Sequence, residues 1–197
     1  MDKSFEVASF LTHNEVDTLL QFYNLLPKTL NEGSDKKAYT TGFDLNQIPI
    51  KNFDSRLKNI FGDFNVTVSM FLEEFEPWAV HSDYFKNDSK PYYAVLIPLD
   101  HQDKDTHTVV FNELGDKKDW KDKLIASVDS NYTEEESALL GHIDASMLEK
   151  VTLYKTHKWR KGDLIAWHRN LLHSSDDFSA VGLKRKIALV IFLNRDD

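Results

Sequence analysis

The hydrophobic residues of this chain follow two periods, one in the first third and another in the remainder. Over residues 16–26 apolar side chains recur at helical spacing, and Pro27 ends the pattern. Thr12 and Glu15 precede it with the spacing of a capping box, in which each side chain binds the other residue's free backbone N–H. A second short helix is predicted for residues 54–61, so the first third is expected to be helical or mixed.

From about residue 65 the apolar residues instead alternate with polar ones, which is the period of a half-buried β-strand. Short apolar runs bounded by polar turns then continue toward the end of the chain. The predicted strands cover residues 66–72, 92–99, 108–111, 151–154, 163–167 and 186–193. Many short strands separated by polar turns predict a sandwich, a barrel or a jelly roll.

One segment, at about residues 113–150, interrupts the strand pattern. Thr133 and Glu136 repeat the capping-box spacing ahead of an apolar stretch, which predicts a helix in its middle. A long insertion in a compact domain is often a lid or a contact surface; a helix that packs on the outside of the barrel is the alternative. We therefore expect a single domain, residues 1–197, in which residues 1–64 support a β core at 65–197 that carries the insertion.

Composition narrows the class of protein. The 197 residues are 41% hydrophobic, enough for a substantial core, and 24 basic against 32 acidic residues give a net charge of −8. This charge disfavours non-specific binding of nucleic acid. The absence of cysteine excludes disulfides and thiolate metal sites. No apolar run is long enough for a secretion signal or a membrane span, so we expect a cytoplasmic protein with no membrane partner, of unknown oligomeric state.

Candidate chemistry begins at His81-Ser-Asp83. In an extended chain, residues two apart point to the same side, so His81 and Asp83 can aim an imidazole nitrogen and a carboxylate oxygen at one point. A second histidine from a distant strand would complete a 2-His-1-carboxylate facial triad, which holds Fe(II) and leaves three coordination positions open. His-x-Asp alone is a weak signal, because such polar pairs also occur by chance in loops.

A downstream segment strengthens this interpretation. A strand is predicted to end near Trp167, and His173 lies where the next strand should begin. Lys184, Arg185 and Lys186 then lead directly into a strongly apolar strand. Cations at the start of a buried strand are costly unless an anion meets them, so the basic run indicates a carboxylate ligand nearby.

The ordered set of motifs resembles the Fe(II)/2-oxoglutarate-dependent oxygenase superfamily, especially its compact prolyl-hydroxylase-like and phage or bacterial members. The resemblance covers roughly residues 65–194. It rests on His-x-Asp at 81–83, Leu-Ile-Pro-Leu-Asp at 96–100, Thr-Val-Val-Phe-Asn at 108–112, Gly-Asp-Leu-Ile-Ala-Trp at 162–167 and Leu-His-Ser-Ser at 172–175. The resemblance implies a mainly β protein with flanking α-helices, built on a double-stranded β-helix, the cupin-like jelly roll.

The same resemblance assigns the site residues. His81, Asp83 and His173 match the iron ligands, and the family places a basic residue after the distal histidine to pair with the distal carboxylate of 2-oxoglutarate. Arg185 and Lys186 both fit, and Arg185 is put slightly ahead because arginine is the better bidentate carboxylate partner. Since neighbours on a strand face opposite ways, only one of the two should point inward.

Two positions are ambiguous. His168 competes with His173 as the distal ligand, although the Leu-His-Ser-Ser context and the spacing to the basic pair favour His173. Some relatives bind the cosubstrate with a tyrosine on the strand before His-x-Asp, and this chain has Met-Phe-Leu there, at 70–72. That role falls to Tyr92 or Tyr93, of which Tyr93 is the candidate, or it is absent.

The resemblance implies an enzyme that uses Fe(II), O2 and 2-oxoglutarate, a small-molecule cosubstrate, with ascorbate as a candidate reductant. It would hydroxylate an unidentified substrate and form succinate and CO2. A protein side chain, an amino acid or a small metabolite is favoured over nucleic acid. The candidates for the mouth of the site are Trp78, Tyr84, Phe85 and Trp167.

Three alternatives remain open at this point. The first is a cupin-type metal-binding protein that keeps the fold without oxygenase chemistry, and the second is an enzyme that uses the triad without 2-oxoglutarate. The third is a structural β-sandwich in which the spacing of histidine and aspartate is a coincidence.

Overall fold

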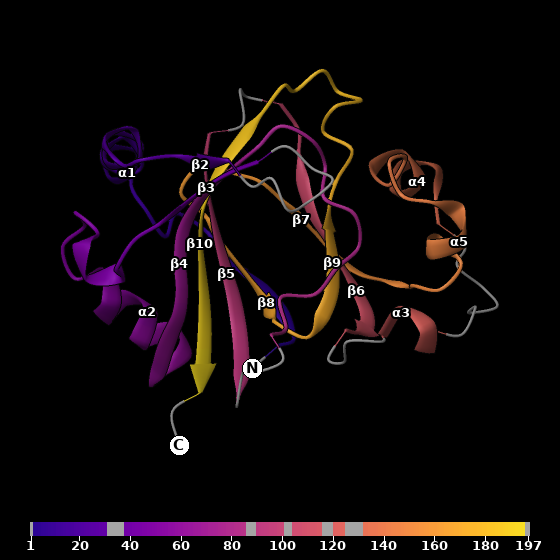
Figure 1. Cartoon of the computed structure of the whole chain (residues 1–197), viewed down its shortest axis with the longest axis horizontal. Coiled ribbons are helices and arrows are strands. Elements are labelled where there is room, and N and C mark those ends of the chain that lie inside the picture. Colours follow the sequence, from indigo (N-terminus) through magenta and orange to yellow (C-terminus); the bar gives the residue numbers. More distant parts are fainter. Residues whose placement is uncertain are drawn as a thin grey trace.

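Two antiparallel β-sheets face each other, and helices cover their outer sides (Figure 1). This computed structural model describes residues 2–30, 38–85, 90–100, 104–115, 120–124 and 132–195. In the larger sheet the strands are ordered β1 (Ser4–Val7), β8 (Leu164–His168), β5 (Pro91–Asp100), β10 (Lys186–Arg195), β4 (Phe64–Glu74), β3 (Ala38–Gly42) and β2 (Thr29–Leu30). The smaller sheet is ordered β7 (Leu153–Lys158), β6 (His107–Leu114) and β9 (Leu171–Ser175). The predicted mainly β jelly roll with flanking helices is confirmed.

The predicted helices begin where their capping signals stand. Helix α1 (His13–Leu25) is capped by Thr12, whose side chain accepts from the N–H of Glu15, and α4 (Glu134–Leu139) is capped by Thr133 in the same way. The second predicted helix is α2 (Phe53–Phe61). The remaining helical turns are η1 (Leu45–Gln47), α3 (Trp120–Lys123) and α5 (Ala145–Leu148).

Strand β10 separates two hydrophobic cores, which explains its unbroken apolar sequence. Its odd-numbered residues, from Ile187 to Leu193, pack into a core that also contains α1 and α2. Its even-numbered residues, from Ala188 to Phe192, face the space between the two sheets. A strand buried on both faces shows no polar alternation, because both sets of side chains need apolar surroundings. This alternation also decides which residues can reach the site.

The N-terminal strands were not predicted. Strand β1 pairs with β8, and β3 pairs with β4, so both extend the larger sheet. Strand β7 begins at Leu153, slightly later than the predicted residues 151–154. The division into a support region at 1–64 and a β core at 65–197 stays a prediction, although strands of both regions share one sheet.

No helix among the described ranges is both long and apolar enough to cross a membrane.

The turn before β8 depends on Gly162. Its φ is +82°, its N–H donates to the carbonyl of Pro98, and its own carbonyl accepts from the N–H of Leu11. A Cβ at this position would lie 2.5 Å from the backbone oxygen of Leu11. Gly182 has a similar φ of +77°, but a Cβ there would meet nothing within 4 Å. Substituting alanine at each of the two glycines therefore separates the cost of backbone strain from the cost of steric overlap.

We expect Gly162→Ala to lower the free energy of unfolding by about 3 kcal/mol, because it adds a steric clash to the cost of a left-handed alanine. Gly182→Ala should lower it by only about 1 kcal/mol, since it carries the conformational cost alone. Urea unfolding of both variants measures the difference. Equal losses would show that the contact with Leu11 does not constrain this turn.

Candidate metal centre

Two segments far apart in the sequence meet at His81 and His173. The N–H of His81 donates to the carbonyl of His173 at 3.0 Å, and the N–H of His173 donates back at 2.9 Å. These bonds form an isolated antiparallel bridge beside β9, and the two imidazole ring centres lie 4.2 Å apart. Residues that exchange both backbone hydrogen bonds are direct cross-strand partners, so their side chains leave the ladder on the same side.

Asp83 joins them because hydrogen bonds to Arg169 hold its backbone in place. Its N–H donates to the backbone carbonyl of Arg169 at 3.0 Å, while its own carbonyl accepts from the Arg169 guanidinium at 2.8 Å. The guanidinium also donates to the side chains of Asn194 at 2.6 Å and Thr67 at 3.3 Å. Arg169, which is fully buried, thereby ties the aspartate's backbone to β10 and β4.

The donor set fits a divalent metal ion. One ligand atom from each of His81, Asp83 and His173 lies within 4.8 Å of the others. The Nδ1 atoms of the two histidines contact the carbonyls of Ala79 and Leu171, at 2.8 and 3.2 Å, which leaves both Nε2 atoms for coordination. Among the described residues, Oδ2 of Asp83 is buried without a hydrogen-bond partner. A cation supplies the interaction that this oxygen lacks.

The electrostatic environment suits the same use. Burial lowers the pKa of His173 well below its usual value, with a further contribution from the adjacent His81, so this imidazole is neutral at pH 7. Burial raises the pKa of Asp83 to about 6, against the opposing attraction of His81 and Arg169. Neutral imidazoles and an ionised carboxylate are the ligand forms that a metal ion requires.

A pocket of about 320 Å³ opens from these three residues between the two sheets. Apolar and polar residues contribute equally in number to its lining. The lining includes Met70, Leu72, Leu96, Trp159, Val190 and Phe192, with Glu74, Thr108 and Ser175 as polar members. Of the aromatic residues expected at the mouth, Trp78, Phe85 and Trp167 line the pocket, whereas Tyr84 is not among its described lining residues.

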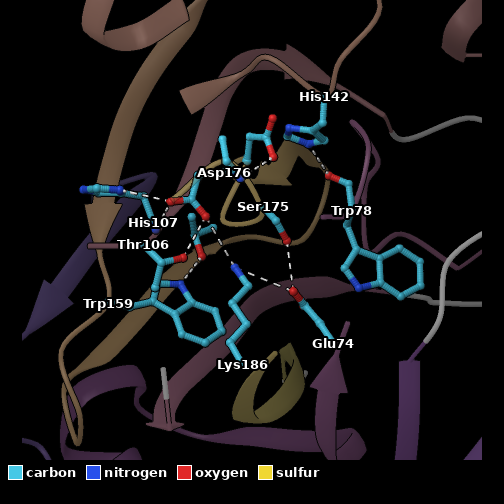
Figure 2. A network of polar contacts seen from close by, with 12 residues as sticks. Glu74, Trp78, Thr106, His107, His142, Trp159, Ser175, Asp176 and Lys186 are labelled. Carbon is cyan, nitrogen blue, oxygen red and sulfur yellow. Dashed lines mark hydrogen bonds and ion pairs between the residues drawn. The ribbon is translucent and has the colours of Figure 1, made fainter. Parts of the chain in front are cut away.

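Strand alternation places Lys186 on the pocket side of β10 and Arg185 outside. Lys186 is fully buried, and its ammonium lies 3.6 Å from the carboxylate of Glu74, a pocket residue (Figure 2). Arg185 is partly exposed and pairs instead with Glu73 at 2.8 Å and Asp100 at 3.5 Å. The expectation that put Arg185 ahead is therefore not supported by the geometry, because the inward position belongs to its neighbour.

Tyr93 and His168 lie on the opposite side of the larger sheet. Tyr93 packs in the core beneath α1 and α2, and its hydroxyl donates to the carbonyl of Asp2 at 2.8 Å. His168 packs against Tyr93, with ring centres 4.7 Å apart. Trp167 faces the pocket, so the next residue of β8 must face away from it. Neither residue is brought to the triad, and a contact between Tyr93 and the cosubstrate stays a prediction.

Three side chains near the site were not singled out from the sequence. Arg169 holds the backbone of Asp83, Glu74 lines the pocket, and His142 contacts the carbonyl of Trp78 at 3.0 Å (Figure 2). His142 belongs to the insertion, which therefore helps to hold one wall of the pocket. Only Glu74 carried a sequence signal, because it follows the predicted strand 66–72 in phase with Met70 and Leu72.

Comparison with known proteins identifies the fold. No protein-family model matches the chain, and no curated protein matches its sequence. Solved structures do match, among them a 2OG-Fe(II) oxygenase family oxidoreductase from Burkholderia pseudomallei, a prolyl-4-hydroxylase from Pseudomonas putida, and HygX from Streptomyces hygroscopicus with nickel and 2-oxoglutarate bound.

These likenesses cover nearly the whole chain. The TM-scores are 0.61, 0.57 and 0.56, and the sequence identities are 10%, 10% and 11%, in the same order. The matches cover 98%, 99% and 98% of this chain and 86%, 94% and 82% of the other proteins. The resemblance to the 2-oxoglutarate oxygenases is thus confirmed at the level of the fold, and at this identity the comparison shows the fold alone.

We expect Arg169→Lys to weaken the binding of Mn(II) about tenfold, as is typical when a residue that orients a metal ligand is changed. A lysine ammonium cannot bind the carbonyl of Asp83 and the side chain of Asn194 with the arginine's planar fork. The dissociation constant, measured by electron paramagnetic resonance, tests this.

Arg160→Lys is the matched control, because this arginine is 58% exposed and lies outside the site. Unchanged Mn(II) affinity in a folded Arg169→Lys protein would contradict the orienting role.

Proposed function

We propose that the chain is an Fe(II)- and 2-oxoglutarate-dependent dioxygenase that hydroxylates a substrate held in this pocket. The observation that carries the proposal is the convergence of His81, Asp83 and His173 at a pocket whose lining residue Glu74 lies 3.6 Å from the buried ammonium of Lys186. The fold agrees with this activity, since the matched structures include 2-oxoglutarate oxygenases. In the proposed enzyme His81, Asp83 and His173 hold the iron.

The second anchor of the cosubstrate is Lys186. A dianion with one carboxylate at the metal needs a cation for the other, and Lys186 provides a positive charge on the pocket side of β10. Among the described residues its Nζ has no hydrogen-bond partner, although it is completely buried. Buried ammonium groups are costly without hydrogen bonds, so an incoming carboxylate oxygen would improve this environment.

The apolar wall serves the reaction by excluding water. Bound iron with 2-oxoglutarate and O2 would supply the oxidative decarboxylation, with succinate and CO2 as products, and the oxidising power for hydroxylation. The protein then has to keep the substrate close and water away. Leu96, Val190 and Phe192 provide a surface without competing hydrogen-bond donors, and Trp78 and Phe85 also line the pocket.

The primary substrate is proposed to be a protein side chain, an amino acid or a small metabolite. Net charge of −8 opposes the approach of a polyanion, which disfavours nucleic acid. Phe85 is 48% exposed and lines the pocket, so an apolar group of the substrate has an aromatic surface to contact as it enters.

We expect an anaerobic mixture of the protein, Fe(II) and 2-oxoglutarate to develop the visible metal-to-ligand charge-transfer band of a chelated 2-oxo acid. His173→Ala should abolish the band because it removes a ligand, whereas His168→Ala should retain it because His168 faces the opposite core. Absorption spectroscopy of the three proteins measures this.

A band that survives in His173→Ala would refute the assigned triad. Iron binding with no band in the parent protein would instead favour a cupin-type enzyme that does not use 2-oxoglutarate.

A further inference from the structure

A directly opposed pair of charges lies at the wall of the pocket, where Glu74 is a lining residue and Lys186 lies beside it, outside the described lining residues. Glu74 and Lys186 are cross-strand partners in the β4–β10 ladder, and both lie on the strand face that lines the pocket. Glu74 is 4% exposed and Lys186 is fully buried. The distance from Nζ to Oε2 is 3.6 Å, close enough for an ion pair but too long for a hydrogen bond (Figure 2).

The surroundings of the ammonium are electrostatically crowded. A second carboxylate, that of Asp176, lies 3.7 Å from Nζ, and the ring centres of Trp159 and Phe178 lie 4.1 and 4.8 Å away. Lys186 therefore has two carboxylate neighbours and two aromatic faces. Among the described residues, no hydrogen bond holds its Nζ in place. One positive charge already faces two acidic groups before any ligand arrives.

The two carboxylates are held very differently. Asp176 accepts from the hydroxyl of Thr106 at 2.7 Å and from the backbone N–H of His107 at 2.6 Å, and it is not among the described residues that line the pocket. Glu74 does line the pocket, and among the described residues its carboxylate accepts one hydrogen bond, from the hydroxyl of Ser175 at 3.1 Å. Burial raises the pKa of Glu74, against the opposing attraction of Lys186. Glu74 is thus the weakly held anion on the ligand side.

We propose that Glu74 is an internal competitor for the distal carboxylate of the cosubstrate. It occupies the Lys186 ammonium, and 2-oxoglutarate has to displace it to bind the same cation. The inference rests on the proposed function and adds a residue that sets cosubstrate affinity. Two carboxylates at one buried cation repel each other, so the competition lowers the affinity for any ligand with a distal carboxylate.

The competition has a ligand-specific consequence. Pyruvate shares with 2-oxoglutarate the 1-carboxylate and 2-keto group that chelate iron, but it has no distal carboxylate. Pyruvate can therefore bind at the metal while Glu74 stays beside Lys186. Removing the charge of Glu74 should strengthen the binding of 2-oxoglutarate and leave that of pyruvate unchanged, which separates this effect from any change at the metal.

The experiment titrates the Fe(II)-loaded protein with each ligand without oxygen and follows the charge-transfer band. Glu74→Gln keeps the size of the side chain and its acceptor for Ser175. We expect it to lower the dissociation constant of 2-oxoglutarate about tenfold or more, the effect of removing one like charge from a desolvated site. Glu74→Met provides the same test if the glutamine variant does not fold.

Glu73→Gln is the matched control. This neighbouring carboxylate is equally buried but faces the opposite side of β4, where it accepts from Tyr23 and Arg185. Its removal should leave the binding of both 2-oxo acids unchanged. The comparison therefore isolates the pocket-facing charge from the general effect of deleting a buried carboxylate on this strand.

Equal or weaker binding of 2-oxoglutarate to folded Glu74→Gln would overturn the proposal, since Glu74 would then support Lys186 rather than compete for it. Tighter binding of both ligands would also overturn it, because the effect would lie at the metal. If the parent protein develops the band with neither 2-oxoglutarate nor pyruvate, the proposed function itself is refuted. That result is distinct from the other two.

Discussion

The two backbone hydrogen bonds between His81 and His173 are the constraint on which the site depends. Metal coordination needs ligand atoms from remote parts of the chain at nearly one point. The bridge fixes both segments in antiparallel register, and its geometry sends both imidazoles to the same side. Asp83, two residues after His81, brings its carboxylate within reach of both imidazoles. Burial and the contact with Arg169 complete the arrangement, but neither could replace the register.

The pocket follows from the alternation of side chains along β4 and β10. Met70, Leu72 and Glu74 face the space between the sheets, as do Val190 and Phe192. The intervening residues support the core under α1 and α2. One strand thus contributes to the stability of the outer core and to the chemistry of the inner space. The position of Lys186 at the start of β10 is part of this pattern, because it continues the inward-facing series.

Sequence patterns predicted the elements with strong local signals. The capping boxes at Thr12 and Thr133 locate helices because they satisfy backbone groups within a few residues. The His-x-Asp pair locates two candidate ligands for a similarly local reason. Strands β1 and β3 escaped prediction because their pairing with β8 and β4 depends on distant partners rather than on their own four or five residues.

The choice between Arg185 and Lys186 could not be made from the same patterns. Arginine is the better carboxylate partner chemically. The strand that follows is apolar on both faces, however, so its sequence does not reveal whether the odd-numbered or the even-numbered residues point inward. The side to which Tyr93 points could not be predicted for the same reason, since β5 is also buried on both sides. Only the register of neighbouring strands, set by long-range pairing, assigns each face. Side-chain chemistry identifies candidates, and sheet topology selects among them.

The most direct test of the central claim is a diffraction measurement on crystals grown without oxygen with Mn(II), a substitute for Fe(II), and 2-oxoglutarate. Anomalous scattering locates the metal, and the density locates both ends of the cosubstrate. We expect one strong anomalous peak among His81, Asp83 and His173, with the distal carboxylate against Lys186. A metal peak elsewhere, or a distal carboxylate bound outside the pocket at Arg185, would contradict it.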